Sequence, residues 1–329
     1  MPNTRIVSLV AVLTLSALAQ APASAADATW RTDGLDHIML WTADIDRATA
    51  VFAVKLGFQV RPGGDFGDGV ANRMVRLGEQ SYIELLYTTK PRAELDDNTR
   101  EDLDALHSDR GARTFAIHPL DFDALDGYLR KRGFDLDLPS PLTFDPDGEG
   151  PRPPVTADWR IASFAKSPVT FGDLFFISYA ESNPTAIQSA DRAITSIHPN
   201  GTQSWSSIWV LSKDIAADRK ALEKMGFVDR GEVEMTRLNA RGVRLEAGPD
   251  SIVLLVPKGE GIAAQALAKR GTHVLGLSLA VKDLARTQRM IERGYGLKLE
   301  QYAGLEGDSI LAPTYDDVGL LFEFHGLSR

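Results

Sequence analysis

Histidine and carboxylate side chains are the main candidates for metal ligands and acid–base groups in this chain, because it contains no cysteine. The absence of cysteine excludes disulfides, thiolate zinc sites, cysteine nucleophiles and iron–sulfur clusters. Only His37 stands where we expect chemistry, inside the apolar run Leu35-Asp36-His37-Ile38-Met39-Leu40-Trp41. Six histidines can serve as metal ligands or as bases near neutral pH: His37, His107, His118, His198, His273 and His325.

Alternation along two apolar runs predicts that His37 shares one sheet face with Glu84. Successive side chains of a β-strand point to opposite faces. If Ile38 packs on a helix, His37 faces the other way, and the same rule turns Glu84 away from Ile83 in the run 81–87. A neutral imidazole and a carboxylate suit Zn, Ni, Fe(II), Mn or Co. A buried glutamate with neither a cation nor a donor would be costly.

Other motifs carry weaker chemical signals. The glycine-rich segment 63–69 lacks the helix and lysine of a phosphate loop, so we interpret it as a flexible connection at the mouth of a pocket. The Gly-x-Ser-x-Gly signature of serine hydrolases does not occur. His198, in His-Pro-Asn-Gly, is expected to shape a turn. His107 and His325 are expected to be exposed to solvent.

Four similar segments follow one another along the chain, and such repeats indicate a fold more strongly than local propensity does. Each has an apolar strand, an aspartate, an amphipathic helix and a Gly-aromatic pair, followed by three strand-like runs. The aspartates precede their glycines by 13, 12, 12 and 11 residues. We expect each aspartate to cap its helix and each glycine to end it: Asp44 with Gly57, Asp121 with Gly133, Asp214 with Gly226, and Asp283 with Gly294.

The repeats predict an α+β protein built from tandem βαβββ units. Two pairs of units form two domains, residues 26–187 and 204–329, joined by a linker over 188–203. Residues 88–110 are polar and charged and are expected to form a loop between the first two units. The proline-rich segment 139–154 is expected to be a loop at the rim of a pocket.

Residues 1–25 are typical of a secretory signal peptide. Arg5 supplies a positive start, the apolar run 6–19 is too short to span a bilayer, and Ala-Ser-Ala at 23–25 matches a cleavage site. We therefore expect a periplasmic or secreted protein, and a retained membrane anchor is the alternative. No later segment has 18 consecutive apolar residues, so we expect no membrane span in the mature form.

Charge and composition narrow the class of partner. The chain has 329 residues and a formal net charge of −9. This acidic balance disfavours a nucleic-acid partner, which would need clustered lysine and arginine. A content of 43% hydrophobic and 25% charged residues is that of an ordinary globular protein. We expect a small-molecule substrate or ligand.

Three motifs of the first unit point to a known family. They are Leu35-Asp36-His37-Ile38, Pro62-Gly63-Gly64 with Gly69-Val70-Ala71-Asn72, and Ser81-Tyr82-Ile83-Glu84-Leu85. With them the chain resembles the glyoxalase-like domain proteins of the vicinal oxygen chelate superfamily, which includes glyoxalase I, extradiol dioxygenases and bleomycin-resistance proteins. The resemblance implies that paired units form curved half-barrels. It also implies a metal on the concave face, held by residues of the first and last strands of a unit.

The resemblance implies that His37 and Glu84 are ligands of a divalent metal and that Glu84 can also shuttle a proton. The second unit does not complete the ligand set, because Thr114 and Phe176 stand at the equivalent positions. Substrate oxygens, water, a loop residue or the second subunit of a homodimer would have to complete it. The alternative is that His37 and Glu84 form a buried hydrogen bond or bind substrate directly. The expected substrate pocket consists of Trp41, Asn72, Tyr82, Thr114 and Phe176.

Two functions remain open. One is an exported glyoxalase-like enzyme, a metal-assisted lyase or isomerase acting on a small oxygenated substrate. The other is a non-catalytic protein that binds and sequesters a small molecule, as relatives of the bleomycin-resistance type do. Glyoxalase I and extradiol dioxygenase activities are disfavoured, because their complete ligand sets cannot be found in the sequence. The incomplete ligand set favours binding, whereas the pairing of His37 with Glu84 favours catalysis.

Overall fold

The computed structural model describes residues 30–78, 81–107, 110–138, 143–144, 155–156, 159–179 and 193–327. The expected signal peptide, residues 1–25, lies outside this part of the chain, as does most of the expected loop 139–154. Within the described residues no helix is long and apolar enough to cross a membrane.

Each of the four repeats folds into a strand and a helix followed by three further strands, as expected. The helix of unit four continues past Gly294 and ends at Gly296, whereas Gly226 ends the helix of unit three as expected. All four helices begin at the expected aspartate, whose side chain accepts a hydrogen bond from the backbone N–H three residues later: Asp44, Asp121, Asp214 and Asp283.

The first half of the molecule contains units one and two. Unit one consists of β1 (Thr32–Trp41), α1 (Ile45–Ala50), the π-helical turn η1 (Val51–Lys55), β2 (Arg61–Asp65), β3 (Val70–Leu77) and β4 (Ser81–Thr88). The connection holds η2 (Arg92–Glu94) and α2 (Asp97–Leu106). Unit two consists of β5 (Gly111–Pro119), α3 (Phe122–Lys131), β6 (Leu136–Asp137), β9 (Trp159–Phe164) and β10 (Asp173–Tyr179), with β7 (Thr143–Phe144) and β8 (Val155–Thr156) paired separately.

The second half contains units three and four. Unit three consists of β11 (Thr202–Leu211), α5 (Ile215–Met225), β12 (Val228–Met235), η3 (Thr236–Leu238), β13 (Ala240–Ala247) and β14 (Asp250–Pro257), followed by α6 (Ile262–Arg270). Unit four consists of β15 (Val274–Val281), α7 (Leu284–Tyr295), β16 (Gln301–Gly304), β17 (Gly307–Ala312), α8 (Tyr315–Val318) and β18 (Leu321–Gly326).

The strands of each half form a curved mixed sheet, and the pairing of Ala112 in β5 with Val274 in β15 joins the two. The order is β2-β3-β4-β1-β5-β10-β9-β6 in the first half and β12-β13-β14-β11-β15-β18-β17-β16 in the second. In each half the first strands of the two units pair antiparallel, and each runs parallel to the last strand of its own unit. This arrangement confirms the expected α+β fold of tandem βαβββ modules, while the exact domain and linker boundaries stay a prediction.

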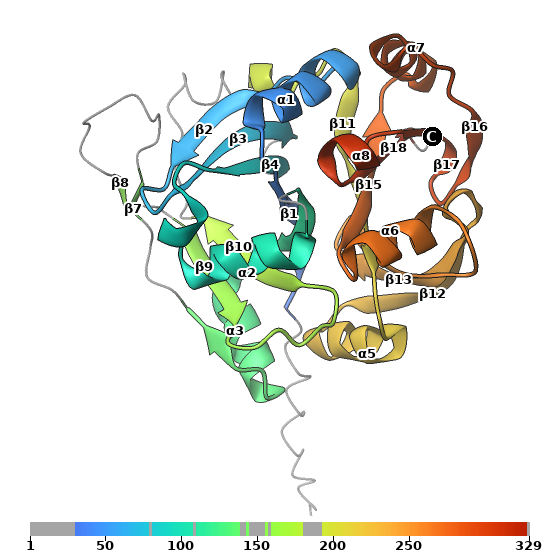
Figure 1. Ribbon diagram of the computed structural model, residues 1–329. Coiled ribbons are helices and arrows are strands. Elements are labelled where there is room, and N and C mark those ends of the chain that lie inside the picture. Colours follow the sequence, from blue (N-terminus) through green and yellow to red (C-terminus); the bar gives the residue numbers. More distant parts are fainter. Residues whose placement is uncertain are drawn as a thin grey trace, which may run out of the picture.

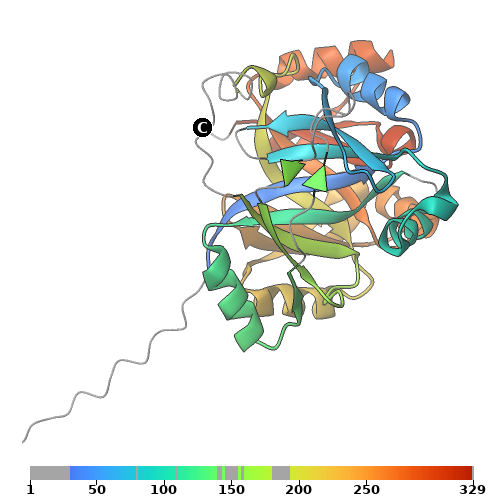
Figure 2. The same ribbon diagram turned by 90° about the vertical axis from the view of Figure 1, so that its left-hand side faces the viewer.

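One hydrophobic core is shared by both halves. Phe52 of η1 packs edge-on against Phe322 of β18, and Trp30 packs against both Phe176 of the first half and Phe227 of the second. Figures 1 and 2 show α1 beside α7 at one end of this core and α3 beside α5 at the other. We call the sheet face that points away from the shared core the inner face.

A helix covers part of the inner face of the first half, where the sequence predicts only a loop. Asp96 caps α2, and Leu103 and Leu106 of this helix pack on Trp41 and Leu86 of the sheet. Two buried leucines in ten residues are too sparse an apolar pattern to indicate a packed helix. In the second half α6 takes the corresponding place, and its Ala263 and Ala266 are buried in a separate cluster.

Candidate active site

A β-bulge in β1 brings two adjacent side chains to the same face of the sheet. Leu35 pairs with Ile117 of β5, and Ile38 pairs with Phe115, so Asp36 and His37 together occupy the space of one opposing residue. In a regular strand these neighbours would point to opposite faces. Here Oδ1 of Asp36 lies 2.5 Å from Nδ1 of His37, and both side chains are almost completely buried.

The Asp36 carboxylate is a hydrogen-bond acceptor for several groups. The Tyr179 hydroxyl donates to Oδ1 at 2.9 Å, and Nδ1 of His118 lies 3.4 Å from Oδ2. Burial alone would raise the pKa of Asp36, but the hydrogen bonds from His118, His37 and Tyr179 outweigh burial and lower it. Asp36 is therefore ionised, and the Nδ1 atom of His37 carries the proton that it donates to this carboxylate.

Glu84 faces the other nitrogen of the His37 ring. Its Oε2 lies 3.8 Å from Nε2 of His37. Alternation along β4 places Glu84 on the inner face, because its neighbours Ile83 and Leu85 are in the shared core. This agrees with the expected common face of His37 and Glu84.

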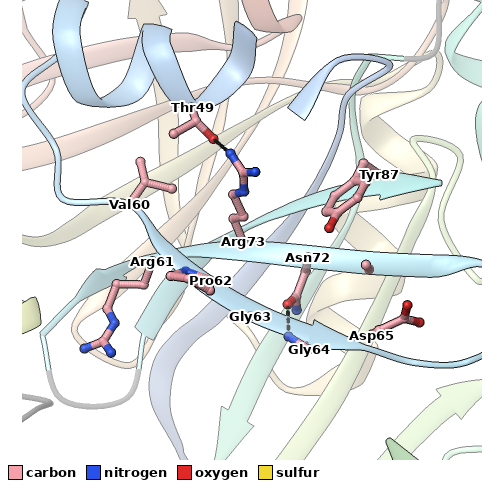
Figure 3. A pocket seen from close by; sticks show the side chains of 11 residues that line it. Thr49, Val60, Arg61, Pro62, Gly63, Gly64, Asp65, Asn72, Arg73 and Tyr87 are labelled. Carbon is pink, nitrogen blue, oxygen red and sulfur yellow. Dashed lines mark hydrogen bonds between the residues drawn. The ribbon is translucent and has the colours of Figure 1, made fainter. Parts of the chain in front are cut away.

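The amide of Asn72 orients Glu84. Nδ2 of Asn72 donates to Oε1 of Glu84 at 2.5 Å, and Oδ1 of Asn72 accepts from the backbone N–H of Gly64 at 2.8 Å. Figure 3 shows the contact between Asn72 and Gly64. Position 63 must be glycine, because a Cβ atom there would lie 1.7 Å from Oδ1 of Asn72. The glycine-rich segment thus supports the candidate site.

A cavity of about 400 Å³ lies beside this support, between α1 and the outer strands of the sheet. Arg73 and Tyr87 line it from β3 and β4, and Arg73 donates to Thr49 of α1 (Figure 3). Arg73 follows Asn72 directly, and Tyr87 lies three positions after Glu84. Both side chains therefore belong to the opposite face of the sheet from Glu84.

The buried acid and base influence each other's ionisation. Burial raises the pKa of Glu84 more than the charge of His37 and the hydrogen bond from Asn72 lower it. For His37 burial would lower the pKa, but the hydrogen bond and charge of Asp36, with the charge of Glu84, raise it overall. Both shifts favour the protonated form, so His37 and Glu84 are the pair that can hold and pass a proton, while Asp36 stays ionised.

Aromatic rings enclose His37. Tyr82 stacks on the imidazole with ring centroids 4.5 Å apart and planes inclined by 13°, and Phe175 approaches edge-on at 5.4 Å. The hydroxyl of Tyr82 is hydrogen-bonded to Tyr179, which in turn donates to Asp36. Burial raises the pKa of both tyrosines, so both remain neutral donors.

The structure brings some of the expected pocket residues together and separates others. Asn72 and Tyr82 contact Glu84 and His37 directly. Thr114 lies on β5 opposite Met39 and is nearly buried. Trp41 lies under α2, where its Nε1 donates to Asp102 at 3.2 Å, so it belongs to an apolar cluster and not to a pocket wall.

Phe176 does not face the site. It is fully buried in the shared core against Trp30, and the preceding residue Phe175 faces His37 instead. The register of β10 explains the difference: Leu174 pairs with Phe115 and both lie in the core, so Phe175 takes the place in unit two that Glu84 has in unit one.

The sequence pattern does not identify Asp36, His118, Tyr179 and Phe175 as site residues. The alternation rule assigns Asp36 to the core side, and only the bulge reverses that assignment. A bulge has no local signature in this run of the sequence. His118 also lies outside the ligand-equivalent positions, and it comes within reach because it pairs opposite Gly34.

The donor set does not fit a resident metal held by this chain alone. The part of the chain that the structure describes contains no group of three or more His, Asp or Glu side chains that could hold a metal ion. His37 and Glu84 supply two donors, whereas protein metal sites use three or four protein ligands. The position from which unit two could add another is occupied by Phe175.

The fold is similar to solved two-domain structures at low sequence identity. A hypothetical protein from Staphylococcus aureus is 15% identical with a TM-score of 0.56, covering 89% of this chain and 98% of the other. A mutant of 4-hydroxymandelate synthase from Streptomyces coelicolor is 13% identical with a TM-score of 0.63, covering 90% and 93%. A catechol 2,3-dioxygenase is 11% identical with a TM-score of 0.52, covering 91% and 89%.

The sequence itself matches a family. No protein of curated function is detectably similar to it. The model of a family described as "Glyoxalase-like domain" matches residues 35–226, more than half of the chain, including β1 and β4 with His37 and Glu84. The chain therefore belongs to the glyoxalase-like domain family of the vicinal oxygen chelate superfamily.

Proposed function

We propose that this protein is an enzyme that moves a proton next to a carbonyl group of a small oxygenated substrate, as an isomerase or lyase does. The arrangement of Asp36, His37 and Glu84 carries the proposal. A carboxylate holds one nitrogen of the imidazole, and the other nitrogen faces a second carboxyl group across 3.8 Å. Such paired groups with opposed environments suit general acid–base catalysis.

Each residue has a distinct part in the proposed reaction. Glu84, whose pKa is raised mainly by burial, accepts a proton from the carbon next to the substrate carbonyl. Protonated His37 donates a hydrogen bond from Nε2 to the carbonyl oxygen and stabilises the enolate charge that forms. Asp36 keeps the ring in the required orientation and favours its charged form. Glu84 then returns the proton to the neighbouring carbon on the same face of the enolate.

Deuterium exchange tests this proposal even when the product is unidentified. The mature protein is incubated in D2O with small α-hydroxycarbonyl compounds and 2-oxo acids, and loss of the C–H signal is followed by NMR. We expect exchange with at least one compound, and Glu84→Gln is expected to slow it by about 100-fold or more. Glu246→Gln, on β13 of the second half, serves as the matched control. Exchange that is equally fast in Glu84→Gln would reject the proposed role.

Ligand sequestration is the second candidate function. The rings of Tyr82 and Phe175 enclose the buried imidazole of His37, and aromatic rings around a polar group favour binding of a small planar molecule. Calorimetry on the same compounds separates the two functions. Binding that is lost in Phe175→Ala, without exchange in the wild-type protein, would support sequestration and exclude catalysis for that compound.

We also propose that the protein is exported. The positive start, the short apolar run and the Ala-Ser-Ala motif at 23–25 support a cleaved signal peptide. N-terminal sequencing of the protein recovered from periplasm and medium tests this. We expect the mature chain to start at Ala26. A chain recovered with its first 25 residues intact in a membrane fraction would indicate an anchor instead.

A further inference from the structure

A second β-bulge lies in β11, at the position that corresponds to the bulge in β1. Trp205 pairs with Leu279 of β15, and Ser207 pairs with Ser278, so Ser206 is the additional residue. The two bulges are at equivalent places in units one and three. The second bulge therefore turns Ser206 toward the inner face of the second half, as the first one does for Asp36.

Ser206 contacts a histidine at hydrogen-bond distance. Its Oγ lies 2.6 Å from Nε2 of His325 on β18. The other nitrogen, Nδ1, lies 2.7 Å from the carbonyl oxygen of Gly326. A carbonyl only accepts, so Nδ1 carries the ring hydrogen of neutral His325, and Nε2 accepts the hydrogen bond from the Ser206 hydroxyl. This is the tautomer that a histidine needs to activate a serine.

The environment of this pair is polar and largely buried. His325, which we expect from its place in the sequence to be exposed, is only 3% exposed, while Ser206 is partly exposed. Ser207 and Ser278 on the same face are fully buried. The Ser207 oxygen accepts from the indole N–H of Trp209 at 3.0 Å, so its own hydrogen remains available to a neighbouring acceptor.

Burial of so many polar groups on one sheet face is costly unless they have partners or a use. Phe322 and Phe324 of β18 face the shared core. Glu323, which lies between them in the sequence, faces the inner side, is fully buried and accepts hydrogen bonds from Ser278 and Tyr302. The part of the inner face around Ser278 and Glu323 is thus polar, and it lies beside the apolar cluster that α6 covers.

We propose that Ser206 is a nucleophile activated by His325, and that the inner face of the second half accepts small acyl esters. Ser206 Oγ forms a bond to the ester carbonyl carbon while its proton moves to Nε2 of His325. The ester C–O bond then breaks, and the departing alcohol takes that proton. Water attacks the acyl-serine and loses its proton to His325; the bond from the acyl carbon to Ser206 Oγ then breaks, His325 returns the proton to Oγ, and the carboxylic acid leaves.

Covalent labelling tests this inference directly. The mature protein is treated with a small alkyl fluorophosphonate, in which the serine oxygen displaces fluoride from phosphorus, and the modified peptide is identified by mass spectrometry. We expect an adduct on Ser206, with a rate constant about 100-fold lower in His325→Gln. Hydrolysis of p-nitrophenyl acetate is expected to fall to the background rate in Ser206→Ala.

Two controls make the result specific. Ser204→Ala alters an exposed serine two residues away on the same strand and is expected to leave labelling unchanged. His37→Gln lies in the other half and is also expected to leave it unchanged, so this test is independent of the proposed proton-transfer function. No adduct on Ser206, or equal rates in the wild type and in a folded His325→Gln variant, would overturn the proposal. If that variant does not fold, equal labelling of Ser206 and Ser204 in the wild type would overturn it.

Discussion

Nδ1 of His37 lies 2.5 Å from Oδ1 of Asp36, the residue directly before it in β1. Neighbouring residues of a regular strand point to opposite faces, so this contact depends on the β-bulge. It determines which ring nitrogen faces Glu84. A local irregularity of one strand thus assembles the candidate acid–base site.

Asp36→Asn is expected to lower the pKa of His37. The hydrogen bond and charge of Asp36 raise this pKa against the opposing effect of burial, and the amide removes the charge while burial remains. An NMR titration of the His37 ring measures the change, with the exposed Asp308→Asn as the matched control. An unchanged titration midpoint in Asp36→Asn would show that Asp36 does not favour the charged ring.

Asn72→Ala is expected to destabilise the fold by about 1–3 kcal/mol, because it leaves the buried Oε1 of Glu84 without its donor. Urea denaturation measures this loss. In a Glu84→Gln background the same substitution is expected to cost less, since no buried carboxylate is left unpaired. Equal costs in both backgrounds would mean that Asn72 acts on the fold independently of Glu84.

Substitutions of the adjacent residues Phe175 and Phe176 are expected to affect different properties, ligand affinity in one case and stability in the other. Phe176→Ala removes a fully buried core ring and should cost about 3–5 kcal/mol in unfolding free energy. Phe175→Ala removes a partly exposed ring that faces His37, and should cost less stability while weakening ligand affinity. Thermal unfolding and calorimetry on both variants measure the contrast. Comparable losses of stability would contradict the assigned faces of β10.

The repeat was predictable from the sequence because it depends on short-range features of each unit. Aspartates that cap helices and apolar residues at helical spacing recur in every unit, and the structure has the four caps as expected. The helix α2 was not predictable in the same way. It is mostly polar, and its burial on Trp41 arises from tertiary contact after the sheet has formed.

The site was predictable only to the extent that the strands are regular. Alternation correctly predicts that His37 and Glu84 share a face, since β4 is regular and β1 pairs with it without a shift from His37 onward. It fails for Asp36, which the bulge turns around, and for Phe176, because the register of β10 differs by one residue from the expected alignment. Both failures concern single-residue shifts, which reverse the face of a side chain.

Metal analysis of the purified protein is expected to find well below one equivalent of Zn, Ni, Fe, Mn or Co. Two donors, His37 and Glu84, bind a divalent cation weakly compared with three or four ligands. The content is expected to be the same in His37→Ala, with Glu246→Gln as control. A near-stoichiometric metal that is lost in His37→Ala would contradict this expectation and indicate a ligand from substrate, from a second subunit or from residues outside the described ranges.

Asp250 is expected to make the stability of the protein depend on pH. Its Oδ2 accepts the backbone N–H of Leu35 at 2.8 Å, which ties β14 of the second half to the strand that carries His37. Burial raises the pKa of Asp250 from its usual 3.8 to about 6, although the hydrogen bond from Leu35 lowers it. The folded state therefore binds more protons than the unfolded state between these two pH values.

The unfolding free energy should consequently fall as the pH rises from about 4 to about 6. The difference between 3.8 and about 6 corresponds to about 3 kcal/mol, lost in full above pH 6. Asp250→Asn keeps an acceptor oxygen for Leu35 and removes the charge. Urea denaturation should therefore find this variant more stable than the wild type by up to about 3 kcal/mol at pH 7.5 and nearly equal at pH 4. Asp308→Asn, at an exposed site, should show no such pH-dependent difference. An Asp250→Asn variant that is less stable at pH 7.5 would mean that the charged hydrogen bond to Leu35 outweighs the cost of burying the carboxylate.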